Sequence, residues 1–256
     1  MTRIAVIDFE TTGISPSMGD RATEVAIVLT EAGRVVDRFQ SLMNAGVRIP
    51  SLITQLTGIT NAMIANAPPA EAVMADAARF VGDTPLVAHN AGFDQRYWRA
   101  ELARAGVPAD HPFACTVLLS RRLYPEVPSH KLGTLVDWFQ LPRTGQAHRA
   151  LADAEMATEL LARIQHDLRE RHGVADPHHG FLMTLQRCAR KALPKLLGPG
   201  TRVKTGSPSG RSAVPHSRDT VGPALPDDWY RPLEGVARSA AGVLPIPAAP
   251  WSRRPP

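Results

Sequence analysis

Residues 4–13 read IAVIDFETTG, a stretch that joins an apolar run to two acids. The first part is β-prone, and the Thr-Thr-Gly sequence that follows is typical of a turn, so we expect a buried strand over residues 4–9. Side chains two residues apart on a strand point to the same face. Asp8 and Glu10 therefore present two carboxylates side by side at the end of an apolar strand.

These two acids are costly in such a position. Carboxylates this close repel each other, and removal from water raises their free energy further. A hard divalent cation, Mg²⁺ or Mn²⁺, is the natural partner of clustered oxygen ligands. The alternatives are that Asp8 or Glu10 caps the following turn, or that both side chains reach water.

A second polar group follows the short apolar strand expected over residues 85–88. Residues 89–94 read HNAGFD. In a mixed sheet, functional side chains collect where strands end and helices begin. Asp94 falls in the first turn of the next expected helix, where its alternative role is to stabilise the helix N-terminus. We expect His89 to be a hydrogen-bonded core histidine and Phe93 a core residue.

The third group is HRALAD over residues 148–153. Five residues along an α-helix rotate a side chain about 140° from the first, so His148 and Asp153 cannot share a face of one regular helix. We therefore expect His148 in the lead-in to the helix, where the backbone orients the ring independently. A solvent-exposed loop histidine is the alternative. Asp153 lies among small apolar residues, where an unpaired acid is costly.

Hydrophobic periodicity and turn residues predict the remaining elements. Three strands in a meander, followed by a strand that alternates with helices, indicate an α/β fold with a mixed sheet flanked by helices. The expected strands are residues 4–9, 23–29, 34–42 and 85–88, and the expected helices are residues 51–56, 69–81, 93–105, 116–123, 132–139 and 150–171.

The composition is that of an ordinary globular protein, with 44% apolar and 21% charged residues among 256. No apolar run approaches the roughly 18–20 residues needed to cross a bilayer, and an acid interrupts the N-terminal apolar stretch too early for a signal peptide. Cys115 and Cys188 lack metal-binding spacing, which argues against a zinc site or a disulfide scaffold. We therefore expect a cytoplasmic protein without a membrane partner.

The net charge of +5 is unevenly distributed along the chain. Residues 1–170 carry 16 Lys and Arg against 19 Asp and Glu, whereas residues 171–256 carry 13 against 5. Basic segments bind phosphate backbones by releasing counterions. The C-terminal third is therefore either a segment that binds nucleic acid or a solvated basic face.

Three segments are expected: a domain over residues 1–171, a basic amphipathic helical extension over residues 172–197, and a tail rich in Pro, Gly and Ser over residues 198–256. Apolar residues recur at helical spacing over residues 181–193, and Pro194 is expected to end that helix. We expect the helix to pack on the first domain, with nucleic acid or a partner protein as alternatives. The tail has 11 of the 23 prolines and few apolar residues, so we expect it to be largely disordered.

Taken together, the patterns D-x-E, H-N-x-x-F-D and H-x-A-x-x-D resemble the three exonuclease motifs of the DnaQ-like superfamily, in its DEDDh branch. This family includes the proofreading epsilon subunit of DNA polymerase III and ribonuclease T. The resemblance covers residues 3–171, and residues 56–60 (LTGIT) also resemble the family's segment between the first two motifs. Thr57 departs from the pattern, because many relatives carry histidine there, so substrate contacts near it rest on fewer matching residues.

The resemblance implies a ribonuclease H-like fold and a two-metal phosphodiester hydrolase. By position, it implies that the four acids of the motifs hold two divalent cations, Mg²⁺ or Mn²⁺, and that His148 is the general base. It also implies residues that contact the terminal nucleotide at a nucleic-acid 3′ end. The implied metal ligands are Asp8, Glu10, Asp94 and Asp153, and the implied substrate contacts are Thr11, Thr12, Gly58 and Ile59.

We expect a 3′–5′ exonuclease that releases nucleoside 5′-monophosphates from DNA, in proofreading or repair. Trimming of RNA 3′ ends is the first alternative, because no motif in the sequence reports how a 2′-hydroxyl is treated. A non-catalytic DnaQ-like module that binds partners is the second alternative. It predicts the loss of at least one ligand or of the base, and none is lost. A DNA polymerase or another repair protein is the expected partner of the C-terminal region.

Overall fold

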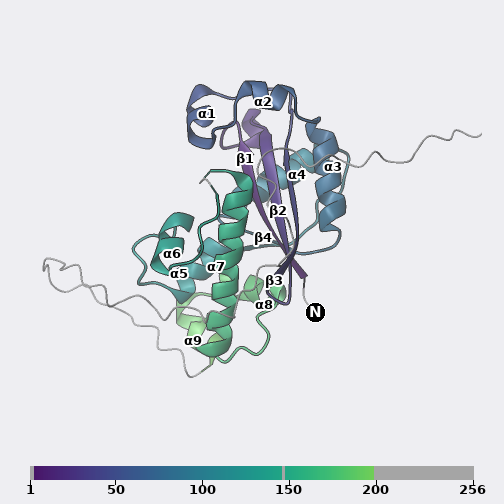
Figure 1. Cartoon of the computed structure of the whole chain (residues 1–256). Coiled ribbons are helices and arrows are strands. Elements are labelled where there is room, and N and C mark those ends of the chain that lie inside the picture. The colour runs from purple at the N-terminus through teal and green to yellow at the C-terminus, as the bar shows by residue number, and fades with distance from the viewer. Residues whose placement is uncertain (1–2, 146–147, 199–256) are drawn as a thin grey trace, which may run out of the picture.

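The computed structural model describes residues 3–145 and 148–198, and its centre is a five-stranded sheet in the order β3-β2-β1-β4-β5 (Figure 1). β2 pairs antiparallel with both β1 and β3, whereas β4 is parallel to β1 and β5 is parallel to β4. The predicted mixed sheet is confirmed. The strands are β1 (Arg3–Thr11), β2 (Ala22–Glu31), β3 (Arg34–Leu42), β4 (Leu86–Ala88) and β5 (Phe113–Cys115).

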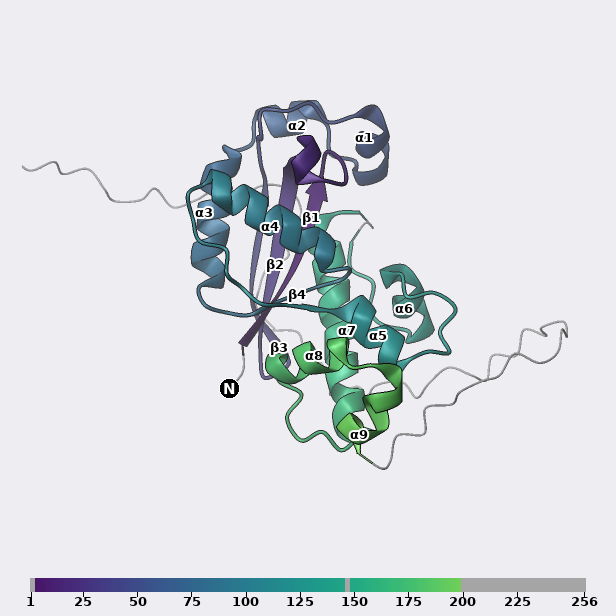
Figure 2. The ribbon, with the colours of Figure 1, turned by 180° about the vertical axis from the view of Figure 1, so that it is seen from behind.

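Helices cover both faces of this sheet (Figures 1 and 2). α3 and α4 pack on one face around Ile7 and Trp98, and α5 to α9 pack on the other around Val6 and Leu160. Among the described residues, none of these helices has both the length and the apolar character needed to cross a membrane. The helices are α1 (Ser51–Thr57), α2 (Asn61–Ala65), α3 (Ala70–Val81), α4 (Gly92–Arg104), α5 (Thr116–Leu123), α6 (Leu132–Trp138), α7 (Ala150–Glu170), α8 (His179–Arg187) and α9 (Leu193–Leu197), with 3₁₀ turns η1 (Pro16–Met18) and η2 (Arg190–Ala192).

The central strand β1 divides its side chains between the two cores. Ile7 and Phe9 pack with α3 and α4, whereas Val6 packs on the side of α7. Asp8 and Glu10 continue the series of Val6, since alternate residues of a strand share a face. The two carboxylates therefore lie on the face that α7 covers, at the end of the strand where the apolar run stops.

The prediction of one continuous helix over residues 181–193 is wrong in the middle of that range. α8 stops short of Cys188, whose backbone is extended (φ −64°, ψ 131°), and η2 and α9 follow as separate turns. The cause is tertiary, because Arg122 of α5 donates from Nε to the Cys188 carbonyl at 2.9 Å. Pro194 falls in the first turn of α9, where its missing N–H costs no helical hydrogen bond, instead of ending a helix.

Two short elements were not predicted from the sequence, strand β5 and helix α2. Their lengths of three and five residues are too short for a hydrophobic period to be recognised. α2 begins after Thr60, whose hydroxyl accepts a hydrogen bond from the backbone N–H of Met63. β5 exists because it pairs with β4, a contact between segments distant in the sequence.

The C-terminal extension packs against the edge of the sheet. The backbone N–H of Cys115 donates to Gln186 Oε1 at 2.7 Å, and Gln186 Nε2 donates to the carbonyl of Phe113 at 3.2 Å. The side-chain amide of Gln186 thus forms hydrogen bonds with backbone groups at the open edge of β5, as a further strand would. The expected packing of the helical part of residues 172–197 is confirmed, while the tail predicted over residues 198–256 lies outside the described residues apart from its first residue.

Replacing Gln186 with Leu tests this edge contact. The variant leaves the buried N–H of Cys115 without its acceptor, so we expect the free energy of unfolding to fall by about 1–3 kcal/mol. Urea denaturation measures the loss. Thr184→Ala, an exposed change on the same helix, is the control and should stay within about 0.5 kcal/mol of the parent. Equal losses in both variants would contradict the role given to Gln186.

Candidate active site

The C-terminal end of β1 carries the first two acids. Glu10 is only 8% exposed, and Asp8 is half-buried. The pairing of β1 with β2 changes register between Glu10 and Thr11, so the regular ladder ends at this point. The carboxylates therefore lie where the strand gives way to a turn and the backbone leaves the sheet.

The third acid comes from the opposite helical layer. Asp94 lies in the first turn of α4 and is only 1% exposed, and neither of its carboxyl oxygens has a hydrogen bond of normal geometry. The chain turns into α4 through Asn90, which has a left-handed φ of 66°, a conformation that Asn tolerates better than most residues. An acid that only complemented the helix N-terminus would gain nothing from such complete burial.

The fourth acid and the histidine lie together at the start of α7. His148 precedes this helix, as predicted, and Asp153 lies in its first turn. His148 has a φ of 61°, and its backbone N–H donates to Asp153 Oδ2 at 3.1 Å. The exposed side chain of His148 has one ring nitrogen that lies, with one carboxyl oxygen each from Glu10 and Asp153, in a group whose members are all within 4.8 Å of one another.

Electrostatic interactions join the four acids into one cluster. Burial raises the pKa of Asp8 well above its ordinary value, and repulsion from the other three acids raises it further. Burial, followed by repulsion from Asp153, raises the pKa of Glu10 to about 8. Burial also raises the pKa of Asp94 to about 8, and nearby backbone amides offset this only in part. The pKa of Asp153 is raised by burial and lowered by its hydrogen bond with the backbone of His148.

The four residues expected to contact a nucleotide differ in their surroundings. Thr11 and Thr12 directly follow Glu10, and both hydroxyls form hydrogen bonds with backbone groups of the following loop, at 2.6 and 3.0 Å. Gly58 ends α1 with a left-handed φ of 72°, and it is the exposed member of the four. The side chain of Ile59 is fully buried in a small apolar core, so it presents no surface to a ligand.

His89 is held by hydrogen bonds on both sides of its ring. Nδ1 lies 2.8 Å from Thr116 Oγ1, and Nε2 lies 3.1 Å from the carbonyl of His130. Burial lowers the pKa of His89 to about 4, so the ring is neutral near pH 7. The expected hydrogen-bonded role is confirmed. Phe93, which was expected in the core, is only partly buried and packs against the core residue Tyr97 with ring centroids 4.9 Å apart.

Two residues beside the cluster were missed from the sequence, Glu24 and Arg149. Glu24 lies opposite Glu10 in the β1–β2 register and is completely buried. Its Oε1 lies 2.9 Å from Nη2 of Arg149. An acid within the apolar run of β2 was a visible signal, but nothing local in the sequence connects it to a residue 125 positions away.

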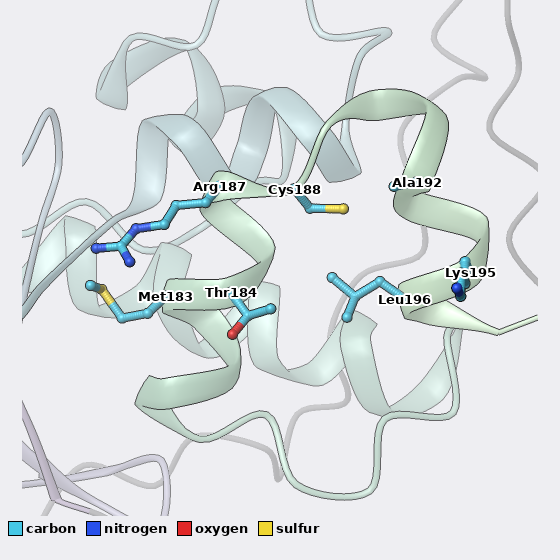
Figure 3. Close-up of a pocket in the computed structure, with 7 residues that line it drawn as sticks. All are labelled: Met183, Thr184, Arg187, Cys188, Ala192, Lys195 and Leu196. Atoms are coloured by element: carbon cyan, nitrogen blue, oxygen red, sulfur yellow. The ribbon is translucent and has the colours of Figure 1, made fainter.

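A pocket lies between α8 and α9 (Figure 3), and α9 lies near the C-terminal end of α7 (Figure 1), whereas Asp153 is in the first turn of that helix. Leu196 of α9 points toward Thr184 of α8 and toward Cys188, which follows that helix (Figure 3). The lining contains the basic residues Arg187 and Lys195 and no carboxylate, so it offers none of the ligands that a hard divalent cation prefers. It is a separate feature from the candidate active site. The lining residues are Met183, Thr184, Arg187, Cys188, Ala192, Lys195 and Leu196.

The family model RNase_T, described as Exonuclease, matches residues 5–161, a range that contains the four acids and His148. The chain belongs to this exonuclease family. The family predicted from the three motifs is confirmed, and so is the ribonuclease H-like sheet with helices on both faces that it implied.

Among the similar proteins are two from Bacillus subtilis. The 3′-5′ exonuclease DinG is 40% identical over 169 residues, which cover 66% of this chain and 18% of DinG. A DNA polymerase III of PolC type is 36% identical over 211 residues, which cover 75% of this chain and 14% of the polymerase. The chain thus spans less than a fifth of each relative. Its fold is also similar to exonuclease X in complex with 5′ overhanging duplex DNA, with a TM-score of 0.54, 25% identity, and coverage of 76% of this chain and 99% of that one.

The crowded acids make stability in metal-free buffer depend on pH. Glu10 and Asp94 hold protons up to about pH 8 in the folded chain but release them near their ordinary pKa values of 4.5 and 3.8 when unfolded. The folded chain therefore binds more protons between those values, and its stability falls as the pH rises from about 5 to 8. We expect the melting temperature in chelator to fall by several degrees over that range.

Calorimetry on the parent and on Asp8→Asn, each with chelator and with Mg²⁺, completes this test. At pH 8 in chelator the variant should melt higher than the parent, because one crowded charge is absent. Added Mg²⁺ should reverse that order, since the complete acid cluster binds the cation more tightly. A parent melting temperature that rose through pH 8 in chelator would show that the acids are not crowded as described.

Proposed function

We propose that the chain is a metal-dependent 3′–5′ exonuclease that hydrolyses phosphodiester bonds from the 3′ end of DNA and releases nucleoside 5′-monophosphates. The observation that carries this proposal is the carboxylate of Asp94, buried with both oxygens unpartnered in a cluster with three other acids. A buried acid without a hydrogen bond is strongly destabilising unless a cation pairs with it.

The donor set fits divalent cations. Asp8, Glu10, Asp94 and Asp153 offer hard oxygen ligands, which Mg²⁺ and Mn²⁺ prefer over the softer sulfur ligands of other sites. The raised pKa values of Asp8, Glu10 and Asp94 indicate that too little positive charge lies near these side chains to stabilise their ionised forms. Two bound ions would activate a water molecule and stabilise the attacking and leaving oxygens of the phosphodiester.

His148 is suited to accept the proton of the attacking water. Its ring is exposed, and one ring nitrogen lies within 4.8 Å of a carboxyl oxygen of Glu10 and of one of Asp153. Histidine is the side chain that most often serves as a general base in enzymes. The left-handed backbone at this position lets the ring approach the cluster from outside the helix.

DNA is the substrate that the relatives favour. One relative is named a DNA polymerase III of PolC type, and the similar solved structure holds a duplex DNA with a 5′ overhang. Ile14 and Leu52, which are 75% and 73% exposed, belong to the loop after β1 and to α1, and they offer apolar surface on which a base can stack. Thr11, Thr12 and Gly58 are the proposed contacts to the terminal nucleotide, whereas Ile59 is completely buried and supports this segment from the core.

The remaining parts of the chain are assigned by charge. Residues 1–171 form the proposed catalytic domain, and the basic surplus of residues 172–197 and 198–256 would add affinity for the phosphate backbone. The same C-terminal region is the proposed contact for a DNA polymerase or another repair protein. We propose the cytoplasm as the chain's place of action.

Product analysis on matched DNA and RNA oligonucleotides tests the proposal. With Mg²⁺, a 5′-labelled single-stranded DNA should shorten stepwise from its 3′ end and yield nucleoside 5′-monophosphates. A blocked 3′ end or added chelator should stop the reaction. Faster release from RNA would favour RNA trimming, and no cleavage of either polymer with Mg²⁺ or Mn²⁺ would favour the non-catalytic module.

His148→Ala should slow cleavage by about 10²–10⁴-fold, the range for the loss of a general base. The metal ligands remain, so Mg²⁺ should still raise the melting temperature of this variant. His89→Ala removes a histidine that already has two hydrogen bonds, and it serves as the control because we expect no comparable loss of rate. Full activity of His148→Ala at neutral pH would remove His148 from the mechanism.

A further inference from the structure

Glu24 is a charged residue that the proposed chemistry does not use. Its side chain on β2 is completely buried, and each of its two carboxyl oxygens accepts two hydrogen bonds. Oε2 accepts hydrogen bonds from Arg149 Nε and from the backbone N–H of Ala150, each at 3.1 Å. Oε1 accepts hydrogen bonds from Arg149 Nη2 at 2.9 Å and from Gln40 Nε2 at 2.7 Å. Every donor is aimed at one buried carboxylate.

The groups that Glu24 holds are adjacent to the histidine in the sequence. Arg149 directly follows His148, and Ala150 is the first residue of α7. The first backbone N–H groups of a helix have no partner within the helix, so Glu24 supplies one that the helix itself cannot. An acid at a helix N-terminus also interacts favourably with the helix dipole.

Glu24 also fixes where the helix begins relative to the sheet. It lies directly opposite Glu10 in the β1–β2 pairing, so its position is set by the same ladder that sets the position of Glu10. A bidentate pair with arginine restricts both distance and orientation. The contact therefore fixes the positions of the residues on either side of Arg149 relative to the paired strands β1 and β2.

We propose that Glu24 is a positioning residue that anchors Arg149 and the first turn of α7 to the sheet, and so holds His148 and Asp153 over Asp8 and Glu10. Glu24 does not touch the substrate or the cations in this proposal. It acts through the backbone that carries the base and the fourth acid. The inference rests on the proposed function, because it assigns Glu24 to the geometry of that reaction.

Positioning and simple stabilisation make different predictions. Misplacing a reacting group by about 1 Å costs roughly 10²-fold in rate, whereas a loss of stability alone leaves the rate of the folded fraction unchanged. A positioning role also predicts that the effects of Glu24 and His148 are not independent, since both variants remove the same well-placed base. Independent effects would multiply.

The central variant is Glu24→Gln, which keeps the size of the side chain but sets an amide N–H against the donors of Arg149 or Ala150. We expect kcat to fall by about 10²-fold with little change in KM. In the double variant with His148→Ala, the loss should be clearly smaller than the product of the two single losses. A loss equal to that product, or a parent-like kcat in Glu24→Gln, would overturn the positioning role.

Two further variants separate placement from folding. Arg149→Gln changes the partner on the surface side, where 31% of the side chain is exposed, so this variant is expected to fold and should also lose kcat. Glu159→Gln is the matched control, because Glu159 is a buried acid of the same helix with one unpartnered oxygen, two turns beyond the anchored end. It should keep the parent kcat. A similar loss of kcat in Glu159→Gln would indicate a general effect of buried acids.

Hydrogen exchange tests the anchor without any nuclease assay. The amide of Ala150 should be protected in the parent and exchange faster in Glu24→Gln, whereas amides in the middle of α7 should be unaffected. Unchanged protection of Ala150 would overturn the anchor. If the parent cleaves no nucleic acid but this amide still depends on Glu24, the proposed function fails while the anchor stands. If the parent cleaves and Glu24→Gln cleaves equally well, the positioning role alone fails.

Discussion

Repulsion among four carboxylates at one end of a buried strand is the constraint around which the rest of the site is arranged. Burial raises the pKa values of Asp8, Glu10 and Asp94, and repulsion from neighbouring acids raises those of Asp8 and Glu10 further, so ionising the cluster without a cation is costly. A fold optimised for stability alone would not bring these charges together. Their presence indicates that the folded state is completed by positive charge from outside the chain.

The architecture brings the acids together from both sides of the sheet. β1 supplies Asp8 and Glu10 on the face covered by α7, and α7 supplies Asp153 from its first turn. Asp94 comes from α4, in the opposite layer, and meets the others at the end of the strand. α4 packs in the core on one face of the sheet and α7 in the core on the other, so Asp94 and Asp153 are held by separate cores, and β1 contributes side chains to both.

The sequence predicted those parts of the site that depend on local geometry. The two-residue period of a strand was enough to pair Asp8 with Glu10, and the angle per helical residue was enough to place His148 ahead of α7. The meeting of the motifs followed from resemblance to a family, since no local rule joins segments so far apart. β5 and the break of the C-terminal helix at Cys188 were missed because both arise from contacts between distant segments.

The same limit explains why Glu24 was overlooked, and the comparison of buried acids shows what distinguishes the site. Glu24 is matched by Arg149, and Glu101 is matched by Arg21, each with a backbone N–H as an additional donor. Asp167 is matched by Arg163 and by the hydroxyl of a buried tyrosine. The fold thus pairs an arginine side chain with each of these three acids, whose role is to hold loops and helices together.

Asp94 is treated differently. Among the described residues it is the acid whose two carboxyl oxygens are both buried without a hydrogen bond of normal geometry, and nearby backbone amides and Arg96 offset the effect of burial on its pKa only in part. An unmatched carboxylate keeps its lone pairs available for an external cation, whereas a matched one has already used them. Glu24, Glu101 and Asp167 are thus neutralised within the chain, whereas the cluster at the end of β1 is left for the divalent cations that we propose. That difference in pairing, and not the number of acids, is our reason for proposing the active site at the end of β1.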